Sequence, residues 1–398
     1  MKRWIRLIGV HFLSVAAIVG AAASARAAQT EATELGLASE TEAAEFRRLC
    51  QVLALTSEQK EAARTLFGEW SRRVSASTTK FNEYNAAIQR RTHNQSELRT
   101  LHRDSYRKFY QYSERVRAER DRDVQLLLSE AQAQRWTLFE REVRRIDSLA
   151  TNGHFSGGSF DVVLETERAL GETEMSDEIA AAIEEYRIAI DRPARVIIES
   201  RRGILERYFD ADMTDFDQRN LADSPHMVQG FEAARTAQAI NIRHARLIMG
   251  LLTAEQAKSF ESELIGTRSW AHGGYEHYRR TLKGMLAGAR SLESISEAQE
   301  AALAEIEARY DEPERALSRR EFDASVESEK LQTIDQLYGW GSEPDGHPAV
   351  KSAAEARKAL SDQVLREVRG VLTAEQLAEL GPPFVEAPET LELNFDED

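Results

Sequence analysis

Apolar and small residues recur at alternating steps of four and three between Thr56 and Arg90. They are Ala63, Phe67, Trp70, Val74, Ser77, Phe81, Tyr84 and Ile88. This heptad spacing puts the apolar side chains along one seam of an α-helix that packs lengthwise on a partner. At about 1.5 Å per residue, such a helix would be roughly 50 Å long.

A polar break at residues 91–95 separates this helix from a second apolar pattern. Ser96 can begin the second helix, which then returns towards Leu128. Its apolar positions are Leu98, Leu101, Phe109, Tyr112, Val116, Val124, Leu127 and Leu128. The two patterns predict a long antiparallel helical hairpin. Since no stretch alternates apolar and polar residues over the length of a strand, we predict an all-α fold.

The pattern L-[ST]-x-x-Q marks helix starts along the chain. It occurs at 55–59, 128–132, 252–256 and 372–376, and with isoleucine in first place at 295–299. Its hydroxyl can accept a hydrogen bond from the amide of the third helical residue, while the glutamine side chain reaches back to the cap amide. The predicted cap residues are Thr56, Gln59, Ser129, Gln132, Thr253, Gln256, Ser296, Gln299, Thr373 and Gln376. A degenerate copy at 175–179 predicts a cap at Ser176, with Ile179 in place of glutamine.

The spacing of these caps predicts a threefold internal repeat of about 120 residues. The opening caps are Thr56, Ser176 and Ser296, which lie 120 residues apart. The closing caps are Ser129, Thr253 and Thr373, which lie 124 and 120 residues apart. Capping motifs can occur wherever helices begin, but that alternative does not account for the spacing.

We therefore expect three tandem long antiparallel helical hairpins, each followed by a short third helix. The units would cover residues 46–150, 163–268 and 283–381. Glycine-rich linkers at 151–158 and 270–275 would separate them.

The first 27 residues have the three parts of a secretory signal peptide. A basic start precedes an apolar run at 7–23 and a small-x-small cleavage site at 25–27. The alternative is a membrane anchor, for which an apolar run of about 17 residues is marginal. No second run of spanning length follows, so we expect a mature chain without a transmembrane segment, in the periplasm or secreted.

Charge is unevenly distributed along the chain. Residues 46–147 carry 21 basic and 14 acidic residues, whereas 148–398 carry 27 and 48. The first unit therefore suits anionic partners, or else it has an ordinary solvated face of paired charges.

The segments 28–45 and 382–398 are acidic, and we expect both to lack fixed structure. Nucleic acid is not expected as the partner of an exported acidic protein.

The sequence offers little reactive chemistry. It contains no G-x-S-x-G, H-E-x-x-H or C-x-x-C motif, so we predict neither an enzyme nor a cofactor site. His272 and His277 are the metal candidates, although a spacing of five does not place both on one helical face, and they can equally be linker residues. Cys50 is the single cysteine. We expect it to be a small buried hydrophobic residue, and the alternative is an intermolecular disulfide.

The placement of the L-T-x-x-Q motif resembles the periplasmic Spy and CpxP-like family, which includes the zinc-resistance-associated proteins. The resemblance rests on the pairs Thr56/Gln59 and Ser129/Gln132 and on their counterparts in the other two repeats. It therefore extends over residues 49–380. It implies a role in envelope stress: binding unfolded proteins on a cradle-shaped surface, modulating a sensor kinase, or sensing metal. Family members are short single units that dimerise, whereas this chain has three.

Our leading hypothesis is an exported helical-repeat protein that binds unfolded or partner proteins through exposed parts of its apolar stripes. A non-chaperone scaffold of the cell envelope and a metal-binding stress protein are the alternatives. Homo-oligomer formation stays open.

Overall fold

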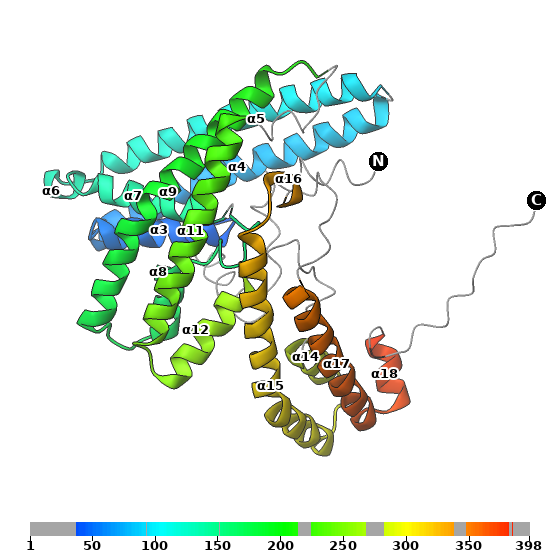
Figure 1. Cartoon of the computed structure of the whole chain (residues 1–398). Helices are drawn as coiled ribbons and strands as arrows, with labels where there is room; N and C mark the ends of the chain where they lie inside the picture. The colour runs from blue at the N-terminus through cyan, green and yellow to red at the C-terminus, as the bar shows by residue number, and fades with distance from the viewer. Residues whose placement is uncertain are drawn as a thin grey trace, which may run out of the picture. The chain divides into compact units, whose positions relative to one another are not determined.

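The computed structural model describes residues 37–92, 94–150, 152–213, 224–267, 282–337, 348–381 and Phe384. Over these residues the chain is all-helical and forms no strand (Figure 1). The predicted signal peptide at 1–27, the histidines His272 and His277, and residues 385–398 lie outside the described residues. None of the helices described is both long and apolar enough to cross a membrane.

The chain forms two compact units. The first comprises Met1–Thr267 with Thr333–Gly341, and the second comprises Arg268–Gln332 with Ser342–Asp398. The first two units expected from the sequence thus fall within the first compact unit.

In the first compact unit, α4 (Ser57–Arg91) and α5 (Gln95–Gln125) pack along each other, as the heptad stripe predicts. Asn94, and not Ser96, caps α5, because its Oδ1 accepts from the backbone N–H groups of Ser96 and Glu97 at 2.9 and 3.3 Å. The short helix α6 (Glu130–Ala133) and the longer α7 (Trp136–Ala150) follow the pair.

Helix α3 (Glu40–Val52) corrects, for residues 40–45, the expectation that the segment 28–45 lacks fixed structure. Ser39 caps it by accepting from the N–H of Glu42. Its apolar face enters the core formed with α4 and α7, and the rings of Phe46 and Phe67 lie 5.3 Å apart. The high acid content concealed an amphipathic helix, since its buried carboxylates have partners inside the unit.

A second long pair consists of α9 (Asp177–Asp210) and α11 (Pro225–Met249). Ser224 caps α11, and Pro225 occupies its first turn, where a missing N–H costs nothing. The shorter helices α8 (Val162–Leu170) and α12 (Ala254–Gly266) pack on each other, with the rings of Phe160 and Phe260 5.1 Å apart.

The glycine-rich stretch expected to be a linker is mostly buried where it is described. Side chains of α11 satisfy its backbone: Asn241 Nδ2 donates to the carbonyls of Gly157 and Gly158 at 3.1 and 3.0 Å, and Gln238 Nε2 donates to that of Ser156 at 2.9 Å. A Cβ on Gly158 would lie 2.4 Å from the carbonyl oxygen of Asn152. Only glycine therefore fits at Gly158, and the stretch is part of the core.

The second compact unit contains α14 (Leu282–Arg290), α15 (Glu297–Glu329), α17 (Pro348–Val371) and α18 (Ala374–Leu380). Helices α15 and α17 form its long pair, and α14 packs on both of them. The last described residue, Phe384, is 5% exposed and packs into the same apolar cluster.

At the closed end of α4/α5, two capping boxes are joined by their glutamines. Gln59 Nε2 donates to Gln132 Oε1, and Gln132 Nε2 donates to Gln59 Oε1, both at 2.9 Å. Each amide also donates to a backbone carbonyl, that of Leu127 at 2.7 Å and that of Ala54 at 3.3 Å. We call this reciprocal pair the glutamine clasp.

The second compact unit has the same clasp. Gln299 Nε2 donates to Gln376 Oε1 at 2.8 Å, and the return bond is 3.3 Å. The same amides donate to the carbonyls of Val371 and Ser294 at 2.9 and 3.0 Å.

The α9/α11 pair has no clasp, because Ile179 stands at the position of the first glutamine. Ser176 still caps α9 by accepting from the N–H of Ile179, whose side chain is 4% exposed. Among the described residues, the side chain of Gln256 bonds only to Thr253. Apolar packing therefore replaces the clasp at this end.

We predict that Gln132→Ala lowers the free energy of unfolding by about 1–3 kcal/mol, since it removes a capping box, both bonds to Gln59 and the bond to the Ala54 carbonyl. The control Gln256→Ala removes only a capping box and is expected to cost about 0.5–1 kcal/mol. Urea unfolding of both variants measures the difference, and equal losses would contradict a role for the clasp beyond capping.

Candidate functional site

Each cap residue expected from the sequence lies at a helix start in the structure. The N-caps are Thr56 for α4, Ser129 for α6, Ser176 for α9, Thr253 for α12, Ser296 for α15 and Thr373 for α18. The structure brings Gln59 to Gln132 and Gln299 to Gln376, and it does not pair Ile179 with Gln256. These side chains hold helix ends, so a binding function must lie elsewhere.

Ion pairs run through the interior of the first compact unit and join helices on both sides of the predicted unit boundary. Arg145 of α7 pairs with Glu142 at 2.9 Å and with Asp161, the N-cap of α8. Arg187 of α9 reaches Glu142 at 3.1 Å. Burial acts to raise the pKa of Asp161, but Arg145 outweighs it, so this pKa lies below its usual value. The pairs explain why the first two predicted units form one compact body.

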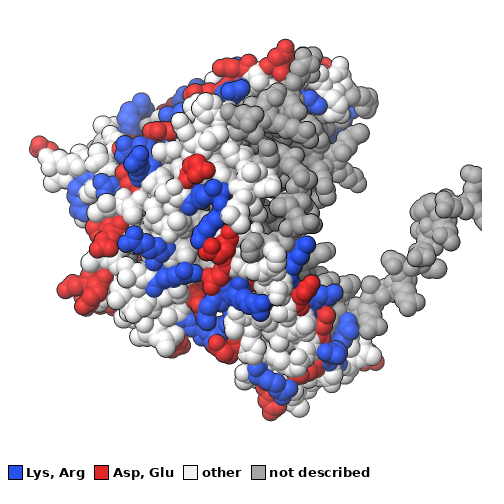
Figure 2. All heavy atoms as spheres, viewed as in Figure 1, with Lys and Arg blue, Asp and Glu red and all other residues white. Residues whose placement is uncertain are grey.

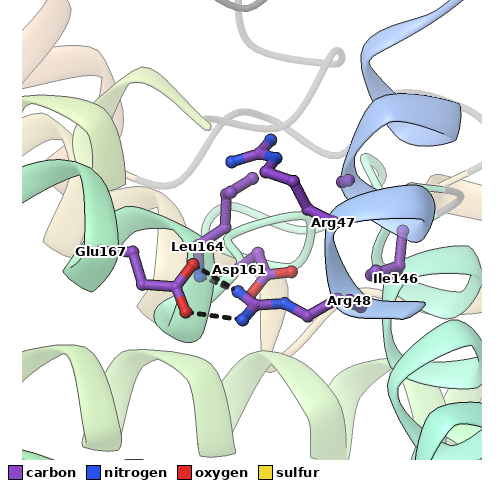
Figure 3. Close-up of a pocket in the computed structure, with 7 residues that line it drawn as sticks. Arg47, Arg48, Ile146, Asp161, Leu164 and Glu167 are labelled. Carbon is purple, nitrogen blue, oxygen red and sulfur yellow. Dashed lines mark hydrogen bonds and ion pairs between the residues drawn. The ribbon is translucent and has the colours of Figure 1, made fainter. Parts of the chain in front are cut away.

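A small pocket lies along this seam (Figure 3). Arg48 of α3 fills its floor and makes a two-pronged contact with Glu167 of α8, at 2.5 and 2.6 Å. The lining is completed by Ala44, Arg47, Ile146, Asp161 and Leu164. Because Arg48 is already neutralised by a protein carboxylate, the pocket serves α3–α8 packing and we assign no ligand to it.

A second buried group of charges joins α3 to α5. Arg120 contacts Glu45 at 2.6 Å and lies 4.3 Å from the ring centre of Phe67. Arg117 bridges Glu45 and Asp147 at 3.4 and 3.0 Å. Sequence reasoning missed Arg120. The available signal was its position four residues from Val116 and Val124, which places a charge on the apolar face.

The distal part of α4/α5 leaves its apolar seam partly open to solvent. Phe81 and Phe109 stack at 5.0 Å but are only half-buried, and Tyr84 is 50% exposed. Tyr112 is also half-buried, with the Arg115 guanidinium 5.4 Å from its ring centre. We define the distal surface as Phe81, Tyr84, Phe109 and Tyr112 with the neighbouring Lys80, Lys108 and Arg115.

The neighbouring pair α9/α11 buries its seam along the whole of α9. The buried side chains run from Ile179 through Tyr186, Ile190 and Ile197 to Phe209. Similar long helices in one compact unit thus differ in how completely they close. On α4 the incompletely closed stretch lies between the buried residues Ser71 and Ile88.

The distal part of α5 is fixed on the C-terminal end of α9, and the ring of Tyr106 contacts both Phe81 of the seam and Phe209 of α9, at 6.0 and 5.7 Å. Arg103 donates to the carbonyl of Ala211 at 2.5 Å, and Arg107 donates to that of Phe209 and pairs with Asp210 at 3.0 Å. Cations at these last carbonyls interact favourably with the helix dipole. This contact braces the hairpin, so the distal surface belongs to a supported element.

Surface charge is otherwise mixed. Figure 2 shows Lys and Arg beside Asp and Glu across the described part of the visible face. Within the described ranges, no group of three or more His, Cys, Asp or Glu is placed to hold a metal ion. Cys50 is half-buried against the α3 core, and burial raises the pKa of its thiol.

Over the described residues the protein is all-helical, its first compact unit has an ion-paired interior, and the distal seam of α4/α5 is incompletely closed. No protein-family model, curated protein or solved structure matches the chain.

Glu165 of α8 makes stability depend on pH. One carboxylate oxygen is buried without a hydrogen-bond partner, while the other pairs with Arg168 at 2.7 Å. Burial, opposed by Arg168 and assisted by Glu263 and Asp161, raises the pKa of Glu165 from 4.5 to about 7. A raised carboxyl pKa means that the folded state holds its proton longer than the unfolded chain, so stability falls as pH rises from about 4.5 to about 7.

We predict that Glu165→Gln removes this loss. The difference in free energy of unfolding between the variant and the wild type should grow in favour of the variant by on the order of 2–3 kcal/mol from pH 5 to pH 8. The reason is that the variant has no charge to bury at this position. Urea unfolding at both pH values measures the change. Parallel behaviour of the two proteins would refute the assignment.

Proposed function

We propose that this chain is an exported helical-repeat protein that binds non-native or partner polypeptides at the distal surface of α4/α5. One observation carries the proposal: aromatic side chains remain half-exposed there, whereas the neighbouring α9/α11 pair is closed. Amphipathic aromatic side chains give large contact area at low entropic cost, which suits recognition of varied segments.

The charge of the same region supports a binding role. Residues 74–113 hold seven Lys or Arg and three Asp or Glu, in a chain whose net charge is −15. Lys80 and Lys108 are exposed. Positive side chains around a half-buried aromatic seam raise the rate of encounter with anionic segments. The apolar contact then determines the lifetime of the complex.

We also propose that the chain comprises three tandem hairpins of one ancestry, related to the Spy and CpxP-like family. The cap spacing supports this, and so does the recurrence of the clasp in α4/α5 and α15/α17. The basic, apolar and small-residue segments of 1–27 support export to the periplasm or beyond the cell. A chaperone or a modulator of a stress sensor fits this setting.

An aggregation assay tests the proposal. We expect the mature chain, at up to equimolar ratio, to suppress light scattering by a reduced or heated client protein. Tyr84→Ser should weaken suppression several-fold, because it removes the most exposed aromatic group of the distal surface. The matched control is Ile188→Ser on α9, which is 64% exposed but lies outside this surface.

Two outcomes would count against binding at this surface. Absence of suppression by the wild type at any ratio would leave a scaffold role as the better account. Equal weakening by Tyr84→Ser and Ile188→Ser would move the binding site away from the distal surface.

A further inference from the structure

The distal surface has a charge and shape that favour one class of polypeptide. Its aromatic side chains form a seam between two helices, and Lys80, Lys108 and Arg115 stand beside it. Arg103 and Arg107 are engaged on the end of α9, and Arg115 pairs with Glu119 at 3.9 Å, so the exposed Lys80 and Lys108 supply the positive charge of this surface. A complementary ligand would offer apolar groups to the seam and carboxylates to the cations beside it.

A polypeptide in extended conformation can present apolar side chains and carboxylates at the same time. Successive side chains of extended backbone point to opposite sides, so alternating apolar and acidic residues produce one apolar edge and one acidic edge. A helix would instead need apolar residues every three or four positions.

The chain itself contains such a sequence. Residues 385–398 include six acidic residues and no basic residue. Leu391, Leu393 and Phe395 alternate there with Glu392, Asn394 and Asp396, and Pro388 disfavours a helix. Fully extended, 14 residues span up to about 48 Å, which exceeds the roughly 27 Å rise of the 18 helical residues from Val74 to Arg91.

We propose that the distal surface selects acidic, extended polypeptide segments with alternating apolar residues, the class to which residues 385–398 belong. The proposal rests on the proposed function and specifies the ligand of the same surface. Apolar side chains of the segment lie on the seam of Phe81 and Phe109, and its carboxylates lie against Lys80 and Lys108.

Fluorescence anisotropy with a labelled peptide of residues 385–398 tests this on the full mature chain. We expect binding at least ten-fold tighter than that of a peptide with every acid replaced by lysine, and tighter than that of one with Leu391, Leu393 and Phe395 replaced by serine. Salt should weaken the binding, because exposed charges are screened. Equal binding of the three peptides overturns the proposal.

Charge reversal locates the site. The double variant Lys80→Glu/Lys108→Glu should bind the acidic peptide about ten-fold more weakly, while Lys351→Glu, an exposed lysine of α17, should leave binding unchanged. Equal effects of the two variants overturn the proposal, and so does tighter binding of anionic lipid vesicles than of the peptide. If Tyr84-dependent suppression of aggregation persists while the acidic peptide fails to bind, only the ligand class is wrong. If both fail, the proposed function fails as well.

Discussion

The closed ends of the long helix pairs are set by hydrogen bonds between glutamine amides. A capping box alone fixes where one helix begins, but it says nothing about a second helix. In α4/α5 and α15/α17 the glutamine of each box also bonds to its counterpart and to a backbone carbonyl near the other box. The motif therefore couples two chain positions more than 70 residues apart. Its spacing in sequence follows from the length of the helices that it closes.

The two long pairs of the first compact unit differ at their closed ends. Where Ile179 replaces glutamine, the end of α9/α11 is closed by apolar packing, and this pair is buried along its length. Where the clasp is present in α4/α5, the distal seam is half-open and is braced from outside by Arg103 and Arg107. A pair held firmly at one end can leave apolar side chains accessible at the other without losing its register, which is a suitable design for a binding surface.

Much of the helix framework could be predicted from the sequence, because its signals are local. Heptad spacing located the seam of α4, and hydroxyl residues marked the helix starts. The helix α3 was missed, because acid content was taken as a sign of missing structure when Glu42 and Glu45 are instead buried beside Ser71 and Arg120. The burial of Gly158 also depends on side chains more than 80 residues away, which no local pattern reveals.

The candidate site could be predicted only in part, because it too depends on contacts between segments that are distant in the sequence. The stripe containing Phe81 and Tyr84 was visible in the sequence, but its incomplete closure depends on how α5 meets α9. Buried ion pairs such as Arg145 with Asp161 join segments that the sequence had assigned to separate units. A charged residue at a position where the helical period calls for an apolar one, such as Arg120, indicates a network of buried ion pairs.

The two glutamines of a clasp are expected to stabilise the helix pair as a unit. A double-mutant cycle of Gln59→Ala and Gln132→Ala in urea unfolding measures this coupling directly. The account predicts that the double variant loses less stability than the sum of the two single variants, by about 0.5–2 kcal/mol, since either substitution already breaks the shared bonds. Strictly additive losses would show that each glutamine only caps its own helix, and would contradict the account.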